Sequence, residues 1–202
     1  MAVNLQKGQK VELRKTDGGS LKKVVIGLGW DEVKKESGGF LGGLFGGKNT
    51  HDIDCDATVF LCVNGKVTTN DDVVYFGNLK HSSGAVRHMG DNLTGAGEGD
   101  DEEIFIDLTS IPAKYDKIIF VVNIYKANER AQHFGMINNA FIRIYDGDNN
   151  QELCRYNLSE NYDGMTAMIF GEMYLRNGQW KFNAIGQATH DNSISELLRR
   201  FA

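Results

Sequence analysis

Short segments rich in β-branched and aromatic residues recur along almost the whole chain, and they constrain the fold more than any other feature. Such segments favour strands over helices, because their side chains pack well on a pleated surface. Their number and spacing predict an all-β protein, built as a sandwich or a barrel. The segments span residues 23–30, 57–63, 73–77, 103–108, 117–125, 140–146 and 166–175.

Turn signals between these segments indicate that most neighbouring strands are antiparallel. Asn64-Gly65 and Asn177-Gly178 each separate two alternating apolar segments, which is the strongest short-range signal for a hairpin. Asp17-Gly18 and Asp146-Gly147 are weaker signals of the same kind.

Helical signals are confined to two places. Ser193 and Glu196 form the pattern of a capping box ahead of the sequence LLRRF, and they predict a short helix at the end of the chain. Residues 127–134 are compatible with a short helical turn.

The composition allows one sizeable core and disfavours several kinds of partner. The chain has 202 residues, of which 41% are hydrophobic, and no Pro- or Ser-rich linker divides it, so we expect a single domain over residues 1–202. Its net charge of −5 disfavours nucleic acid or an anionic membrane as a purely electrostatic partner. The N-terminus has no apolar signal segment and no apolar run reaches the length of a membrane span, so we expect a cytoplasmic protein.

The three cysteines, Cys55, Cys62 and Cys154, form no CxxC pair. An odd number of cysteines without that spacing argues against a disulfide framework and against a structural zinc site. We expect reduced, mostly buried thiols.

The glycine-rich segment SGGFLGGLFGGKNT, residues 37–50, interrupts the strand pattern. Its glycines make a regular strand or helix costly, so a mobile loop is expected. One interpretation is a surface insertion whose apolar side chains fold back on the domain. The other is an exposed apolar loop that contacts a partner or a membrane through residues 38–47.

The stretch GDNLTGAGEGDDEE, residues 90–103, is the strongest candidate for a functional site, because it contains six carboxylates and four glycines. No Lys or Arg occurs between residues 88 and 113, so its counter-charge must come from elsewhere in the fold. A phosphate loop is excluded, since carboxylates after the glycines would repel a phosphate. An EF-hand starting at Asp91 is excluded as well, because its third and fifth positions are Leu93 and Gly95.

A second glycine-containing acidic segment, YDGDNNQELC, also fails as an EF-hand. Counted from Asp146, its sixth position is Gln151 instead of glycine and its twelfth is Asn157. It is better interpreted as a hairpin turn.

An irregular calcium loop remains for residues 90–103. Calcium takes six to eight oxygen ligands in flexible geometry, and glycines allow backbone carbonyls to turn inward, whereas magnesium demands near-octahedral geometry. The alternative is a solvated acidic loop between strands. The candidate side-chain ligands are Asp91, Asn92, Asp100, Asp101 and Glu102, and the candidate carbonyls belong to Gly95, Gly97 and Gly99.

Other acidic residues stand at strand ends and would complete such a site. The alternation of side chains along a strand puts residues 52, 54 and 56 of HDIDCDATVF on one face. Asp31 ends the segment GLGWD, and Asp71 and Asp72 open the segment VVYFG. Each of them alone is an ordinary turn or edge aspartate. Together they match a cluster at one end of a sandwich.

The chain resembles the TerD/TerZ family of tellurium-resistance proteins, which also includes bacterial general stress proteins. The resemblance implies a two-sheet antiparallel β-sandwich with calcium bound at one rim, a link to tellurite and other chemical stress, and no established catalytic activity. It extends over nearly the whole chain and is carried by GLGWD (27–31), DIDCDA (52–57), GDNLTGAGEGDDE (90–102), AFIRIYD (140–146), TAMIFGEMY (166–174) and FNAIGQ (182–187).

The metal-binding roles of that family fall on matching positions of this sequence. We expect about two calcium ions at this rim. Cys55 stands where the family often has leucine, which is a core substitution. The implied ligands are Asp31, Asp54, Asp56, Asp91, Asn92, Asp100, Asp101 and Glu102, with Asp72 as a weaker inclusion.

Four functions are compatible with these observations. The favoured one is a non-enzymatic calcium-binding module that assembles with other stress and tellurite-resistance proteins. A second is calcium-dependent docking to an anionic membrane, with Phe40 and Phe45 inserted. A third is a metal-dependent hydrolase, which the sequence disfavours because the histidines show no ligand spacing and His88, nearest the acidic stretch, suits a buried role better than a proton shuttle. The fourth is direct tellurite chemistry at the thiols.

Overall fold

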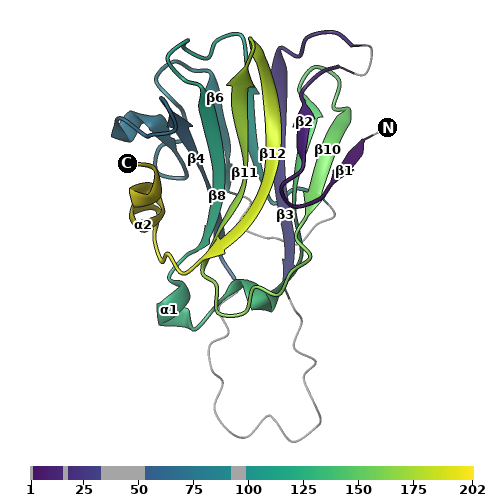
Figure 1. Cartoon of the computed structure of the whole chain (residues 1–202). Coiled ribbons are helices and arrows are strands. Elements are labelled where there is room, and N and C mark those ends of the chain that lie inside the picture. Colours follow the sequence, from purple (N-terminus) through teal and green to yellow (C-terminus); the bar gives the residue numbers. More distant parts are fainter. Residues whose placement is uncertain (1, 16–17, 33–52, 92–98) are drawn as a thin grey trace, which may run out of the picture.

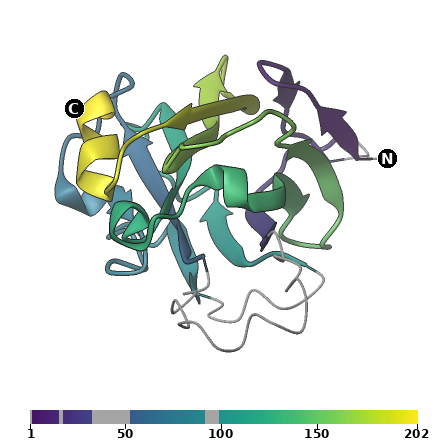
Figure 2. The ribbon, with the colours of Figure 1, turned by 90° about the horizontal axis from the view of Figure 1, so that it is seen from below.

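The strands form two sheets that pack face to face, as the sequence predicts (Figures 1 and 2). The structure is a computed structural model, and it describes residues 2–15, 18–32, 53–91 and 99–202. Within these residues each sheet has six strands, and the chain ends with a short helix. The predicted all-β sandwich with a C-terminal helix is therefore confirmed.

The first sheet contains the strands that carry the acidic stretch. Its strands pair in antiparallel fashion, except for the parallel pair β1 and β10 at one edge. In spatial order they are β1 (Val3–Leu5), β10 (Glu152–Asn157), β9 (Ile137–Asp146), β3 (Lys23–Glu32), β7 (Glu102–Asp107) and β6 (Val86–Asp91).

The second sheet is antiparallel throughout the described residues. In spatial order its strands are β2 (Lys10–Glu12), β12 (Gln179–Thr189), β11 (Ala167–Arg176), β8 (Lys117–Ile124), β4 (Cys55–Cys62) and β5 (Val73–Val74).

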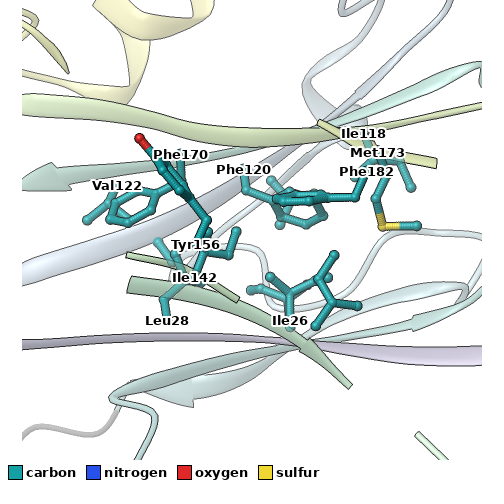
Figure 3. Close-up of a cluster of buried hydrophobic side chains, with 14 of the residues drawn as sticks. Ile26, Leu28, Ile118, Phe120, Val122, Ile142, Tyr156, Phe170, Met173 and Phe182 are labelled. Carbon is teal, nitrogen blue, oxygen red and sulfur yellow. The ribbon is translucent and has the colours of Figure 1, made fainter. Parts of the chain in front are cut away.

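The main core fills the space between the two sheets. Figure 3 shows side chains of the first sheet facing large aromatic side chains of the second. A smaller core lies on the outer face of the second sheet, where Phe60, Ile119 and Val121 pack under Leu197 of α2 (Ile194–Leu198). Burial on both faces explains why β4 and β8 read as nearly continuous apolar runs.

The predicted turns are present where the structure describes them. Asn64-Gly65 and Asn177-Gly178 have positive φ at both positions, as the favoured two-residue hairpin turn requires. The segment after Asp146 is a hairpin turn between β9 and β10, in which the Asn150 amide donates to the Asp146 carbonyl at 2.8 Å. Asp17 lies outside the described residues.

One predicted strand is much shorter than expected. The segment 73–77 forms a strand only at Val73–Val74. Tyr75 and Asn78 then exchange two backbone hydrogen bonds of 3.1 and 2.9 Å, which closes a tight turn. The Asn78 side chain stabilises this turn by donating to the Val73 carbonyl at 2.8 Å.

The helical predictions are confirmed. The Ser193 hydroxyl accepts a hydrogen bond from the Glu196 amide at 3.2 Å and caps α2. The Glu196 carboxylate accepts from the Asn192 amide at 2.7 Å, whereas a capping box would have it accept from the Ser193 amide. The segment 127–134 contains α1 (Ala127–Arg130) and the start of a 3-10 turn at Phe134–Met136. Among the described residues, no helix is long and apolar enough to cross a bilayer.

Candidate functional site

The end of the acidic stretch runs alongside β3. β7 pairs with β3 up to Leu28, which lies opposite Glu102. Beyond this pair the Asp101 amide donates to the Leu28 carbonyl, and the Asp101 carboxylate accepts from the Trp30 amide, both at 2.7 Å. The β3–β9 register shifts between Gly29 and Asp31, so Trp30 has no partner there on β9. This irregularity fixes the Asp101 carboxylate against the end of β3.

Asp100 is balanced by a cation from another strand. Its two carboxylate oxygens accept from Nε and a terminal nitrogen of Arg143, at 2.7 and 2.9 Å. Arg143 lies opposite Gly27 in the sheet, and a Cβ on Gly27 would come within 2.0 Å of the Asp100 carboxylate. Gly27 therefore leaves the room that Asp100 occupies. Burial raises the pKa of Asp100, although the Arg143 guanidinium opposes this effect.

Three carboxylates, those of Asp31, Asp100 and Glu102, are near enough to Asp101 for their charges to act on it, and we call these four residues the acid cluster. Burial raises the pKa of Asp101, and the negative charges of its three neighbours raise it further, against the hydrogen bond from Trp30. Asp31 is exposed and accepts from the Asn139 side chain at 2.8 Å. A bound proton or a bound cation would therefore reduce the repulsion between these carboxylates.

Glu102 joins the two sheets in the interior. One of its oxygens accepts from the Ala57 amide on β4 at 2.5 Å and lies 3.6 Å from Nε2 of His88. The other oxygen, Oε1, is buried and has no hydrogen-bond partner among the described residues. His88 is 4% exposed, and its Nδ1 accepts from the Gly90 amide at 3.2 Å, so the buried role expected for this histidine is confirmed.

Asp54 directly precedes β4 and Asp56 is the second residue of that strand, next to Ala57, whose amide donates to Glu102. Asp54 is 3.7 Å from a terminal nitrogen of Arg130 in α1, and Asp56 is buried on the outer face of the second sheet. Cys55, between them, faces the main core. Burial raises the pKa of the Cys55 thiol, and the negative charges of Glu102, Asp56, Asp54 and Asp101 raise it further.

Asp72 is not brought to the acid cluster. β5 is antiparallel to β4 and pairs Val73 with Phe60, so the residue that opens β5 lies beside the far end of β4. There Asp72 accepts hydrogen bonds from the Thr68 amide and hydroxyl, from the Thr69 amide and from the Tyr115 hydroxyl. Its surroundings are those of a structural carboxylate that organises a turn.

The remaining predicted ligands cannot be placed in the same way. The backbone of Asp91 ends β6 opposite Glu102, and Asn92, Gly95 and Gly97 lie outside the described residues, as does the segment 38–47. Within the described part of the chain, no three His, Cys, Asp or Glu side chains are arranged to hold a metal ion together.

Sequence reasoning missed the groups that organise the acid cluster. Arg143 occupies one outward position in the strand segment AFIRIYD, and nothing in its neighbourhood marks it as the partner of an aspartate 43 residues earlier. The glycines of GLGWD are the available signal, because a strand interior tolerates glycine where another group approaches closely. Gly27 and Gly29 are close to Asp100 and Phe141 respectively.

The comparisons with known proteins agree with this fold. The family model described as TerD domain matches residues 1–201. Over its full length the chain is 49% identical to stress response protein SCP2 of Bacillus subtilis, also matched in full. It is 45% identical to tellurium resistance protein TerD of Serratia marcescens, over 93% of this chain and 91% of that protein. A crystal structure of a TerD homologue from Streptomyces coelicolor aligns with a TM-score of 0.65 at 19% identity, over 91% of this chain and 99% of the other. The chain belongs to the TerD domain family.

Proposed function

We propose that this protein is a non-enzymatic calcium-binding module of the bacterial response to tellurite and other chemical stress, and that it acts by calcium-dependent assembly with other stress proteins. Similar proteins carry names that refer to stress response and tellurium resistance. These names support the proposed role in stress response, and the acid cluster supports the proposed calcium binding.

The observation that carries the proposal is the surplus of negative charge around the buried carboxylate of Asp101. Asp31, Asp100 and Glu102 surround it, while the Arg143 guanidinium engages both oxygens of Asp100. Glu102 also keeps one buried oxygen without a partner among the described residues. Carboxylate oxygens are the ligands that calcium prefers, and a bound cation would satisfy both features.

The proposal gives the predicted ligands unequal roles. Asp31 and Asp101 are the best placed, with Glu102 behind them, because Asp100 is already paired with Arg143. Further ligands would come from Asp91, Asn92 and the glycine peptides. Asp54 and Asp56 would serve a second ion or none, and Asp72 would serve neither.

A non-enzymatic role is supported by the histidine beside the cluster. His88 is buried behind Glu102 and is no more accessible to a substrate than the core residues around it. A general base must reach the proton that it abstracts. The position of His88 therefore does not support the alternative function of a metal-dependent hydrolase.

Titration calorimetry of metal-stripped protein with calcium and with magnesium tests the metal. We expect calcium to bind, magnesium to bind more weakly, and Asp101→Asn to lose the site. Asp148→Asn is the matched control, because this carboxylate lies at the β9–β10 turn and pairs with Lys15 and Lys23. Equal calcium binding by wild type and Asp101→Asn would reject the acid cluster as the site.

Assembly is tested separately, by recovering the tagged protein from tellurite-challenged cells in calcium or in chelator. The proposal expects partners that are retained in calcium, released by chelator and absent with Asp101→Asn. The same variant should fail to restore tellurite survival in a strain that lacks the wild-type copy. Full survival with a variant that no longer binds calcium would show that tellurite resistance does not require calcium binding.

A further inference from the structure

A cavity of about 900 Å³ opens on the outer face of the second sheet. It lies between α1, the N-terminal end of α2 and the turn that follows β5, on the same flank of the sandwich as β4 (Figures 1 and 2). No residue of the acid cluster lines it. Its volume is in the range of small-molecule sites in proteins.

The charged groups of the cavity already have partners within the fold. Asp71 accepts from the Ser82 hydroxyl, and the Lys126 ammonium is 3.5 Å from the Glu129 carboxylate. Asp56, at the floor, has an interaction partner as well. Each charged group that the structure describes around the cavity is therefore engaged, and a neutral ligand suits the cavity better than an ion does.

Neutral polar groups line the floor and the rim. Asn123 of β8 is 5% exposed, and its amide oxygen has no hydrogen-bond partner among the described residues. A buried acceptor of this kind costs free energy unless a donor reaches it. Asn70, Asn128 and Ser195 add exposed amide and hydroxyl groups at the rim. Because amides and hydroxyls both donate and accept, these groups suit a ligand that carries several hydroxyls.

Phe76 supplies an exposed aromatic ring on the wall. The residue is 49% exposed, and its ring meets the Tyr75 ring in a T-shaped contact with the centroids 5.2 Å apart. The Tyr125 ring differs, because the cations of Lys126 and Arg130 lie over it at 5.5 and 5.1 Å. Phe76 is therefore the ring that a ligand can cover, and covering it removes apolar surface from water.

We propose that this cavity binds a neutral saccharide of one or two rings. The apolar C–H face of a sugar ring packs on Phe76, and its hydroxyls bond to the amides and hydroxyls around it. One hydroxyl donates to the Asn123 amide oxygen. Such a ligand satisfies the buried acceptor and adds no charge to a cavity whose charged groups are already engaged.

Residue-resolved NMR titration of the whole protein, at constant calcium, tests the site with glucose, galactose, N-acetylglucosamine and maltose. Cyclohexanol, which has a ring but one hydroxyl, and putrescine, which is a cation, are the comparison ligands. We expect at least one sugar to saturate shifts at the cavity residues and to bind at least about tenfold more tightly than either comparison ligand. No saturation by any of the four sugars up to about 100 mM, or equal binding of cyclohexanol or putrescine, would overturn the proposal.

Two variants test the two contacts that the proposal needs. Phe76→Ala and Asn123→Leu should each weaken sugar binding about tenfold. Asn123→Leu should leave the melting temperature equal or higher, because it replaces an unsatisfied buried amide by an apolar group of similar shape. Leu175→Ala is the control for Phe76→Ala, since Leu175 is 39% exposed and does not line the cavity, and it should bind sugar as wild type does. Wild-type sugar affinity in Phe76→Ala or in Asn123→Leu would overturn the assignment.

Calcium titration of the same proteins separates the cavity from the acid cluster. Phe76 is not a predicted calcium ligand, so Phe76→Ala should lose sugar binding and keep wild-type calcium affinity. Asp101→Asn should show the reverse, with wild-type sugar affinity. The sugar proposal and the calcium proposal can therefore fail independently of each other.

Discussion

Asp100 and Arg143 form a bidentate ion pair on the outer face of the first sheet, in which two guanidinium nitrogens donate to the two carboxylate oxygens at 2.7 and 2.9 Å. Gly27 lies beneath the carboxylate and opposite Arg143, so three segments that are distant in the sequence meet at one point. The acidic stretch has no Lys or Arg near it in the sequence, and this contact shows that Arg143 on β9 supplies the counter-charge for one of its carboxylates. Asp101, Glu102 and Glu103 are the described members of the stretch without a paired Arg or Lys among the described residues, and Glu103 accepts from the Tyr145 hydroxyl instead.

Arg143→Ala should destabilise the protein by about 3 kcal/mol, because it leaves the buried Asp100 carboxylate unpaired beside other carboxylates. The free energy of unfolding in urea, measured without added calcium, checks this value. Arg14→Ala is the control, since Arg14 pairs with Glu12 on an exposed surface and should cost less than about 1 kcal/mol. A loss for Arg143→Ala as small as that of the control would contradict a buried pair.

Gly27→Ala should destabilise the protein through the same contact, because the new methyl group would displace the Asp100 carboxylate from Arg143. The double variant with Arg143→Ala should therefore lose less stability than the two single changes added together. We expect a coupling energy of at least about 1 kcal/mol, measured by urea unfolding of all four proteins. Additive losses would show that Gly27 acts independently of the ion pair.

Asp72 should make the protein sensitive to acid. Burial alone would raise its pKa, but the hydrogen bonds from Tyr115, Thr68 and Thr69 outweigh burial and lower the pKa to about 2. Since the unfolded chain takes up this proton first, the stabilisation is complete above about pH 4 and is lost as the pH falls from about 4 to about 2.

The pH dependence of urea unfolding measures this contribution, which should be about 2 kcal/mol. Asp72→Asn should be less stable at neutral pH and should lose less stability on acidification than wild type. Glu160→Gln, at an exposed ion pair, should follow the wild-type curve. An Asp72→Asn curve parallel to that of wild type would contradict the assignment.

The thiols should be inert in the folded protein. Burial raises the pKa of Cys62 and of Cys154 to about 12, and Cys55 is raised well above its usual value. Because the thiolate is the reactive form, a thiol reagent at pH 8 should label native protein orders of magnitude more slowly than urea-unfolded protein. Rapid labelling of any thiol in native protein would reopen tellurite chemistry at cysteine.

Most of the fold could be predicted from the sequence, because the strands with the clearest β-branched runs form the centre of each sheet. Strand β12 was implied only by the turn at Asn177-Gly178. Strands β1, β2, β6 and β10 were not predicted, and three of them, β1, β2 and β6, lie at sheet edges. Their segments, such as Lys10–Glu12, are short and partly exposed, and pairing with a neighbour stabilises them more than their own composition does.

The candidate site could be predicted only in part. The sequence identifies the acidic residues, and the end of β3 lies beside Asp101 as a rim cluster requires. It cannot show that Asp100 pairs with Arg143 or that Asp72 lies at the other end of β4, because both depend on strand order and direction. Nor can it show that Asp56 lies opposite Asn123, since these residues meet only through the pairing of β4 with β8.

The most direct test of the central proposal is the melting temperature of metal-stripped protein titrated with calcium, with magnesium in parallel and with Asp31→Asn, Asp101→Asn as the variant. If the acid cluster binds calcium, the ion should raise the melting temperature in proportion to the logarithm of its concentration above the dissociation constant. Magnesium should do so less, and the double variant should lose the shift. A melting temperature that does not respond to calcium, or a variant that responds as wild type does, would contradict the assignment.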